Sequence, residues 1–200
     1  MKKITVYGLP LNPLSALEQL KGASFCVSYA TRKKLNKQLD DAMRLVGEAG
    51  ILLIDNGAFS MYRRGEATGF DEGYLEGFEA WAGAILEKCP QAIAVVPDVI
   101  GGTEEENAEL CRISQLDPDR AMGIWHLNES FDYLIWLCET YGWVGFGSAG
   151  DYWQVGTEKW HARVKAAFAA IDAWEAGGEG ESRRRGGSRI ALFLKKEDET

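Results

Sequence analysis

Acidic, histidine and glycine residues follow several short apolar runs of this sequence, and their types suit chemistry at a sugar or a heterocyclic base. Two of the runs end in Asp55 and Asp98. A carboxylate that directly follows aliphatic residues loses hydration, so we expect each to be paired or to act on a ligand. Two carboxylates at one glycosidic carbon can divide the work. One attacks C1′ or stabilises an oxocarbenium ion, and the other handles protons at the leaving base.

Other roles for these two acids stay open at the level of sequence. Asp55 is also suited to accept N–H bonds from the turn at residues 56–58, and Asp98 to cap the helix that follows Gly101-Gly102-Thr103. Alternatively, one of the two carboxylates reads the donor edge of a heterocycle.

Two later apolar runs end in further candidate residues. His126 is a candidate general acid or base, a donor to a base edge, or a packed core residue. Asp151 is the third candidate catalytic acid, and Glu129 either contacts substrate or supports the start of the next helix. The glycine-rich stretch 145–150 lets a ligand approach the backbone. The other expected substrate contacts, by backbone or by stacking, are Asn56, Gly57, Phe59, Trp125, Gly147, Ser148, Gly150 and Tyr152.

The elements that must position these residues alternate between β and α. Apolar runs predict strands at Ile4–Tyr7, Ser24–Tyr29, Ile51–Asp55, Ile93–Val96, Ala121–His126, Trp143–Gly147 and Ile190–Leu194. Amphipathic runs predict helices at Leu14–Leu20, Lys33–Ala49, Asp71–Lys88, Glu104–Gln115, Phe131–Tyr141 and Glu158–Glu175. Thr103, Ser130 and Thr157 are expected helix caps, and Gly50 an expected helix stop.

This alternation indicates an α/β fold with parallel strands, either a (β/α) barrel or an open doubly wound sheet. A full barrel usually takes about 250 residues, so a TIM-barrel-like (β/α) parallel barrel that is small or incomplete, in a single domain, is the favoured fold class. We expect a catalytic domain at residues 1–175, a flexible linker at 176–189, and a last strand with a polar tail at 190–200. Ligands of such folds bind beyond the carboxyl ends of the strands, where the candidate residues fall.

The amino-acid composition limits which kinds of molecule this protein is expected to bind. The chain has 200 residues, and 22 basic against 30 acidic residues give a formal charge of −8. Any nucleic acid must therefore be held by a local patch or a narrow pocket. The four cysteines, without a CxxC pair, are expected to be reduced and buried, with no metal and no cofactor. No apolar run is long enough for a membrane span or a leader, so we expect a cytoplasmic protein of unknown oligomeric state.

The motifs resemble those of a known enzyme superfamily. Leu53-Ile54-Asp55-Asn56-Gly57-Ala58-Phe59-Ser60 is similar to the DSGGF segment of tRNA-guanine transglycosylases, and more similar to the DSGAF variants of the DNA 7-deazaguanine insertion enzymes, the DeoxyPurine-in-DNA protein A family. The segments 95–101, 125–129 and 146–152 resemble later segments of the same relatives. By motif, Asp55 and Asp98 correspond to the aspartates that open the bond and read a purine-like base.

The resemblance implies an enzyme that acts on the N-glycosidic bond of a modified or purine-like base in DNA, or in another nucleic acid, with the free base as second partner. The chain has no Cys/His cluster like the zinc site of the tRNA enzymes and no DCVxPTR-like segment. Base exchange and excision with water therefore both stay open, with phage–host DNA modification or defence as one setting. The alternatives are a barrel enzyme for nucleosides or sugar phosphates and a non-catalytic nucleic-acid- or nucleotide-binding relative.

Overall fold

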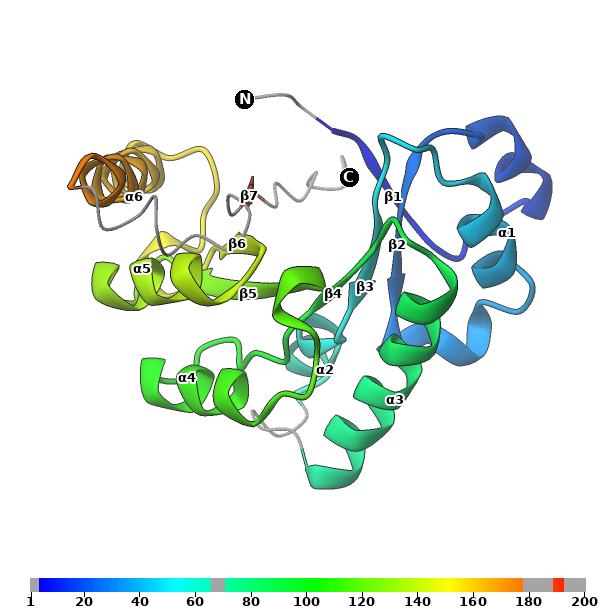
Figure 1. The fold of residues 1–200 in the computed structure, drawn as a ribbon, viewed down its shortest axis with the longest axis horizontal. Coiled ribbons are helices and arrows are strands. Elements are labelled where there is room, and N and C mark those ends of the chain that lie inside the picture. The colour runs from blue at the N-terminus through cyan, green and yellow to red at the C-terminus, as the bar shows by residue number, and fades with distance from the viewer. Residues whose placement is uncertain (1–3, 66–70, 178–188, 193–200) are drawn as a thin grey trace. The chain divides into compact units, whose positions relative to one another are not determined.

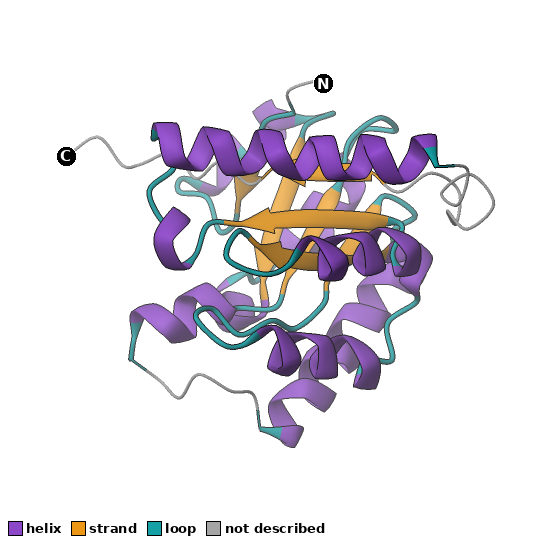
Figure 2. Ribbon diagram, turned by 90° about the vertical axis from the view of Figure 1, so that its left-hand side faces the viewer, coloured by secondary structure: helices purple, strands orange, loops and turns teal. Residues whose placement is uncertain are grey.

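The computed structural model describes residues 4–65, 71–177 and 189–192. The chain forms two compact units, the first made of Met1–Pro97 with Ser114–Leu116 and the second of Asp98–Ile113 with Asp117–Thr200. In both units parallel strands are joined by helices, drawn orange and purple in Figure 2. The expected linker, residues 176–189, and the polar tail lie almost entirely outside the described residues.

The first unit holds four strands in chain order, β1-β2-β3-β4. Its elements are β1 (Val6–Gly8), η1 (Leu14–Ala16), η2 (Glu18–Leu20), β2 (Ser24–Ser28), η3 (Tyr29–Lys34), α1 (Gln38–Leu45), β3 (Leu52–Asp55), α2 (Ala58–Arg63), α3 (Glu72–Lys88) and β4 (Ala92–Val95), where η marks a 3₁₀ helix (Figure 1). Helix α3 packs on β4. Phe25, Ile54 and Phe78 are fully buried in the core of this unit.

The second unit holds three strands and the helices that precede or follow them along the chain. Its elements are α4 (Glu104–Ile113), η4 (Pro118–Arg120), β5 (Ala121–His126), α5 (Phe131–Thr140), β6 (Trp143–Gly147), η5 (Gly150–Tyr152), α6 (Glu158–Ala176) and β7 (Arg189–Leu192). Strand β6 pairs in parallel with β5 and with β7. Helix α5 packs on β5, β6 and α6, over a core that contains Trp125, Leu134 and Phe146.

The predicted fold class is confirmed. In a doubly wound sheet the strand order reverses at a switch point, whereas in a (β/α) barrel it follows the chain. Within each unit the strands are parallel and in chain order, and the described residues contain seven strands against the eight of a full barrel. The fold is therefore a small, incomplete α/β fold of the parallel barrel type.

Helix caps read from the sequence are present. Thr103 and Glu106 form a reciprocal capping box: Thr103 N donates to Glu106 Oε2 at 2.7 Å, and Glu106 N donates to Thr103 Oγ1 at 3.2 Å. Ser130 accepts from the backbone N–H of Tyr133 at the start of α5, and Thr157 caps α6 in the same way. These caps fix where α4, α5 and α6 begin, directly after strand ends or the turns that follow them.

Several helix predictions need correction. The helix expected at Leu14–Leu20 is divided into the 3₁₀ helices η1 and η2. The single helix expected at Lys33–Ala49 is divided into η3 and the shorter α1, because Asn36 adopts a left-handed conformation with φ +49°. Helix α1 ends at Leu45, so Gly50 is not its stop. Helix α2 lies between β3 and α3, where the sequence analysis predicts no helix.

None of the helices in the described ranges combines the length and apolarity that crossing a membrane requires.

Candidate functional site

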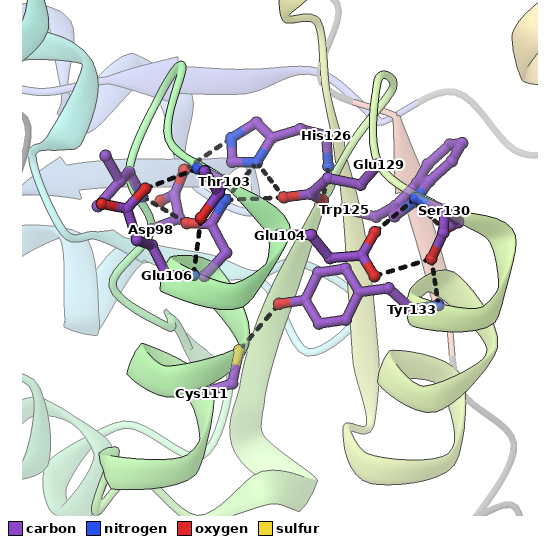
Figure 3. A network of polar contacts seen from close by, with 12 residues as sticks. Asp98, Thr103, Glu104, Glu106, Cys111, Trp125, His126, Glu129, Ser130 and Tyr133 are labelled. Atoms are coloured by element: carbon purple, nitrogen blue, oxygen red, sulfur yellow. Dashed lines mark hydrogen bonds and ion pairs between the residues drawn. The ribbon is translucent and has the colours of Figure 1, made fainter.

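A chain of buried polar side chains in the second unit centres on His126, the last residue of β5 (Figure 3). Its Nε2 lies 3.1 Å from Asp98 Oδ2, and its Nδ1 lies 3.2 Å from Glu129 Oε1. Only 5% of the imidazole and 1% of the Glu129 side chain are exposed, whereas 12% of the Asp98 side chain is exposed. Of the three linked side chains Asp98, His126 and Glu129, Asp98 is therefore the one that solvent or a ligand reaches most readily.

His126 is a cation near neutral pH. Burial alone would lower the pKa of its imidazole, but hydrogen bonds to Asp98 and Glu129, together with their negative charges, raise it to about 10. The imidazolium donates through both nitrogens, one to each carboxylate. His126 thus contacts both carboxylates and is buried, as a packed core residue is, and its role as a general acid or base stays a prediction.

Asn107 of α4 completes this arrangement. Its Oδ1 accepts from the backbone N–H of Val99 at 2.7 Å, which fixes the orientation of the amide, and its Nδ2 donates to Glu129 Oε1 at 2.7 Å. The same Nδ2 lies 3.2 Å from His126 Nδ1, but two donors cannot bond, so its proton goes to the carboxylate. One side chain thus ties the segment after Asp98 to the turn that carries Glu129.

The turn after β5 brings Glu129 back to His126. The backbone N–H of His126 donates to Glu129 Oε2 at 2.6 Å, and that of Glu129 donates to the His126 carbonyl at 2.8 Å. Gly147 on the neighbouring strand β6 makes room for the ring, because a Cβ there would lie 2.8 Å from His126 Cδ2. A side chain at position 147 would therefore collide with the imidazole, and the expectation that Gly147 contacts a ligand stays a prediction.

Arg163 of α6 holds the same turn from its other side. Its Nε donates to the Leu127 carbonyl at 2.7 Å, and a terminal nitrogen donates to the Glu129 carbonyl. The guanidinium lies 4.1 Å from the ring centre of Phe131 and 5.1 Å from that of Trp125. The backbone that positions Glu129 is therefore fixed by a long-range contact.

Glu104 joins the starts of α4 and α5, as Figure 3 shows. Its Oε2 accepts from the backbone N–H of Ser130 at 2.6 Å, and its Oε1 accepts from Ser130 Oγ at 2.9 Å. Ser130 in turn accepts from the first turn of α5, so one acid supports the cap of the neighbouring helix. The base of the site is thereby held on two helices as well as on β5.

Asp55 lies in the first unit, at the end of β3, and is half-buried. Its charge adds to burial in raising the pKa of Tyr74, and also in raising the pKa of the Cys26 thiol to about 12. The Tyr74 hydroxyl donates to the Asn56 carbonyl at 2.8 Å. Asp55 and Asp98 belong to different units, and the expectation that they act on one sugar stays a prediction.

Asn56 and Gly57 shape the backbone after β3. The Asn56 amide is buried, donating to the Val96 carbonyl at 2.9 Å and accepting from the Ala58 N–H at 2.8 Å. Gly57 has φ +91°, and a Cβ there would lie 2.7 Å from the Tyr74 hydroxyl. Both residues shape the backbone after β3, and the expectation that Asn56 contacts substrate stays a prediction.

The residues after β6 are placed at the surface. The Asp151 side chain is 80% exposed and pairs with Lys159 at 2.8 Å, and the hydrogen bond and charge of that lysine lower its pKa. Ser148 Oγ accepts from Trp160 Nε1 at 3.0 Å. Such an exposed ion pair is a weak basis for catalysis, so the structure does not single out Asp151 as it does Asp98. Gly150 has φ +54°, a conformation that favours glycine.

The aromatic candidates divide into buried and exposed residues. Trp125 is fully buried and donates through Nε1 to the Ser130 carbonyl, so the expectation that it stacks on a base is wrong. Phe59 is 44% exposed on α2, and Tyr152 is half-buried beneath Lys159. Phe59 and Tyr152 keep the exposure that stacking needs.

Asn107 and Arg163 are the site residues that sequence reasoning missed. Both contact the turn that carries Glu129 from far along the chain, Asn107 from 22 positions and Arg163 from 34 and 36 positions away. The one available signal was an asparagine at the fourth position of the acidic helix α4, directly after the capping box. Within the described ranges, no cluster of His, Cys, Asp and Glu side chains is arranged to hold a metal ion.

The arrangement in the second unit can hold one carboxylate, Asp98, against the imidazolium of His126 at the end of β5. Such a group can attack an electrophilic carbon or stabilise positive charge that develops beside it. Comparison of the chain with protein-family models, curated proteins and solved structures finds no match.

Proposed function

We propose that this protein acts on the N-glycosidic bond of a modified or purine-like base in DNA, by base exchange or by excision, with Asp98 as the reacting carboxylate. The observation that supports this most is the buried chain Asp98–His126–Glu129, whose most exposed member is Asp98. Cleavage of such a bond passes through an oxocarbenium-like state, and a fixed carboxylate beside C1′ stabilises it.

The positive charge of His126 suits this role. An imidazolium that donates to Asp98 keeps the carboxylate in one orientation while the sugar gains positive charge. In the excision reaction, the C1′–N bond breaks, water forms the new C1′–O bond, and the proton of that water ends on the released base. In the exchange reaction an incoming base takes the place of water.

Mass spectrometry of released bases tests the proposal. The full chain is incubated with DNAs that carry normal and 7-deazaguanine-type nucleotides, and Asp98→Asn is compared with Asp172→Asn on the exposed side of α6. Asp98→Asn should lower base release by at least a hundredfold, the lower range for loss of one electrostatic group. Asp172→Asn should match the wild type.

The outcomes separate the parts of the proposal. If the wild type releases no base from any of these DNAs, and incorporates none, the proposed reaction is wrong. If Asp98→Asn retains full activity, the assignment of Asp98 is wrong even though the reaction stands. Asp55→Asn is measured in parallel, because Asp55 is the other strand-end aspartate that the motif identifies.

A free nucleoside or sugar phosphate is the second candidate substrate, and the formal charge of −8 favours it over a polyanion. Salt distinguishes the two. Binding of a polymer weakens steeply as salt rises, because each neutralised phosphate releases counterions, whereas binding of a neutral nucleoside does not. Measuring activity on DNA and on the matching free nucleoside over about 50 to 200 mM salt decides between them.

A further inference from the structure

From the first unit we infer that a basic and aromatic surface beside Asp55, formed by Lys33, Lys34, Phe59, Tyr62, Arg63 and Arg64, holds the backbone and bases of a nucleic-acid strand. This inference rests on the proposed function. It assigns a surface on which a protein of net negative charge binds a polyanionic substrate.

The two segments that form this surface follow neighbouring strands. Strands β2 and β3 are parallel, with Ser28 in register with Asp55 at their carboxyl ends. Segment η3 follows β2, and α2 follows β3 after Gly57 (α2 is labelled in Figure 1). A Cβ on Gly57 would lie 2.9 Å from the Ala30 Cβ, so the start of α2 packs directly on η3. The basic residues of both segments therefore lie at the edge of the sheet where Asp55 lies.

The charge of these segments is opposite to that of the whole chain. Residues 29–38 and 58–64 contain six basic residues and no acidic residue, in a protein with a formal charge of −8. Lys33, Lys34 and Arg63 are exposed, and no acidic side chain in the described part of the chain forms an ion pair with them. Their charge is thus available to phosphate groups.

Arg64 and Arg32 extend the positive field toward the strand end. Both lower the pKa of Tyr74 against the larger effects of burial and of Asp55, so both charges act near that hydroxyl. The Tyr74 hydroxyl bonds to the carbonyl of Asn56, the residue next to Asp55.

The exposed aromatic rings distinguish a nucleic-acid strand from other polyanions. Phe59 and Tyr62 on α2 are 44% and 54% exposed, although contact with water does not stabilise an apolar ring. Arg63 lies 6.0 Å from the ring centre of Phe59. Interleaved basic and aromatic side chains are typical of single-strand binding, in which bases stack on rings while cations follow the backbone.

Fluorescence anisotropy with a labelled oligonucleotide of about 20 nucleotides, single-stranded or duplex, tests the inference over about 50 to 200 mM salt. The triple variant Lys33→Ala/Lys34→Ala/Arg63→Ala removes three positive charges from the surface. Lys21→Ala/Lys88→Ala/Lys165→Ala removes three exposed charges elsewhere and is the matched control. Circular dichroism checks that both variants fold.

The surface variant should lower the slope of log K against log salt by about 2 to 3 on duplex DNA, because each lost phosphate contact lowers it by about 0.9. Phe59→Ala and Tyr62→Ala should each weaken single-strand binding by roughly five- to 150-fold, the loss of one stacked base. The control should bind as the wild type does.

Three results would overturn the inference: no DNA binding by the wild type, equal losses in the surface variant and its control, or binding of vesicles rich in anionic lipid without binding of DNA. Failure of the proposed reaction looks different. DNA binding that needs the surface, without any base release, would leave this surface in place and reject the chemistry. Base release from a free nucleoside without DNA binding would reject the surface and DNA as the substrate, and would leave the reaction itself in place.

Discussion

Titration of His126 should be visible in the stability of the protein. The pKa of this imidazole rises from 6.5 to about 10 on folding, because Asp98 and Glu129 hold its charged form. Since one pKa unit is worth about 1.4 kcal/mol, the difference corresponds to roughly 5 kcal/mol. The folded pKa lies above the unfolded one, so this stability is fully present below about pH 6.5 and is lost as the pH rises toward 10.

The window from about pH 7 to about pH 8.5 isolates this group, because the Cys26 thiol, whose pKa is raised from 9.0 to about 12, begins to contribute only above it. Within the window the free energy of unfolding should fall by about 2 kcal/mol. Urea unfolding at several pH values measures this fall. His126→Gln should remove it, and His161→Gln, an exposed residue of α6, should keep it.

Loss of the cation leaves Asp98 and Glu129 facing each other, so His126→Gln should also cost roughly 3–5 kcal/mol at neutral pH. If that variant does not fold, NMR of ¹⁵N-labelled histidine in the wild type gives the same answer. The chain has two histidines, and His161→Gln assigns their signals. A His126 ring that loses its proton below pH 8 would refute the reasoning, as would equal pH slopes in the wild type and His126→Gln.

Three further substitutions probe the same region. Gly147→Ala places a Cβ 2.8 Å from His126 Cδ2 and should cost about 1–3 kcal/mol by overpacking, measured by urea unfolding, with a shifted His126 NMR signal. Glu129→Gln removes one of the two charges that hold the imidazolium and should lower the pKa of His126 in an NMR titration, whereas Glu105→Gln on the exposed side of α4 should leave it unchanged. Thr103→Ala breaks the capping box of α4 and should lower the unfolding free energy by about 1 kcal/mol; no change would show that Glu106 alone caps the helix.

Local signals in the sequence located most of the elements. Strands β5 and β6 have the bounds that their apolar runs predict, and the caps at Thr103, Ser130 and Thr157 are present. Strand periodicity and helix caps depend on residues close in the sequence, so they can be predicted from a single sequence. The break at Asn36 was missed because its helical pattern continues across it while the backbone takes a left-handed turn.

The candidate site was predicted in part. Strand ends located Asp98, His126 and Glu129, because parallel strands place their carboxyl ends on one side. The way these three side chains bond to one another depends on tertiary contacts with Asn107 and Arg163, and no local sequence pattern predicts such contacts. The same limit explains why the role of Trp125 was mispredicted. The sequence around an aromatic residue at a strand end is the same whether its ring faces a ligand or, as here, the core.

The amide of Asn107 bonds to the backbone of Val99 and to the carboxylate of Glu129. That carboxylate bonds to one nitrogen of the His126 imidazole, and the other nitrogen bonds to Asp98. Asp98 therefore loses its rotational freedom when the protein folds and has little left to lose when a ligand arrives. A preorganised charge of this kind makes binding and reaction less costly in entropy. The hydrogen bonds of Asn107 and Glu129, which touch no ligand, thus contribute to whatever affinity Asp98 has for one.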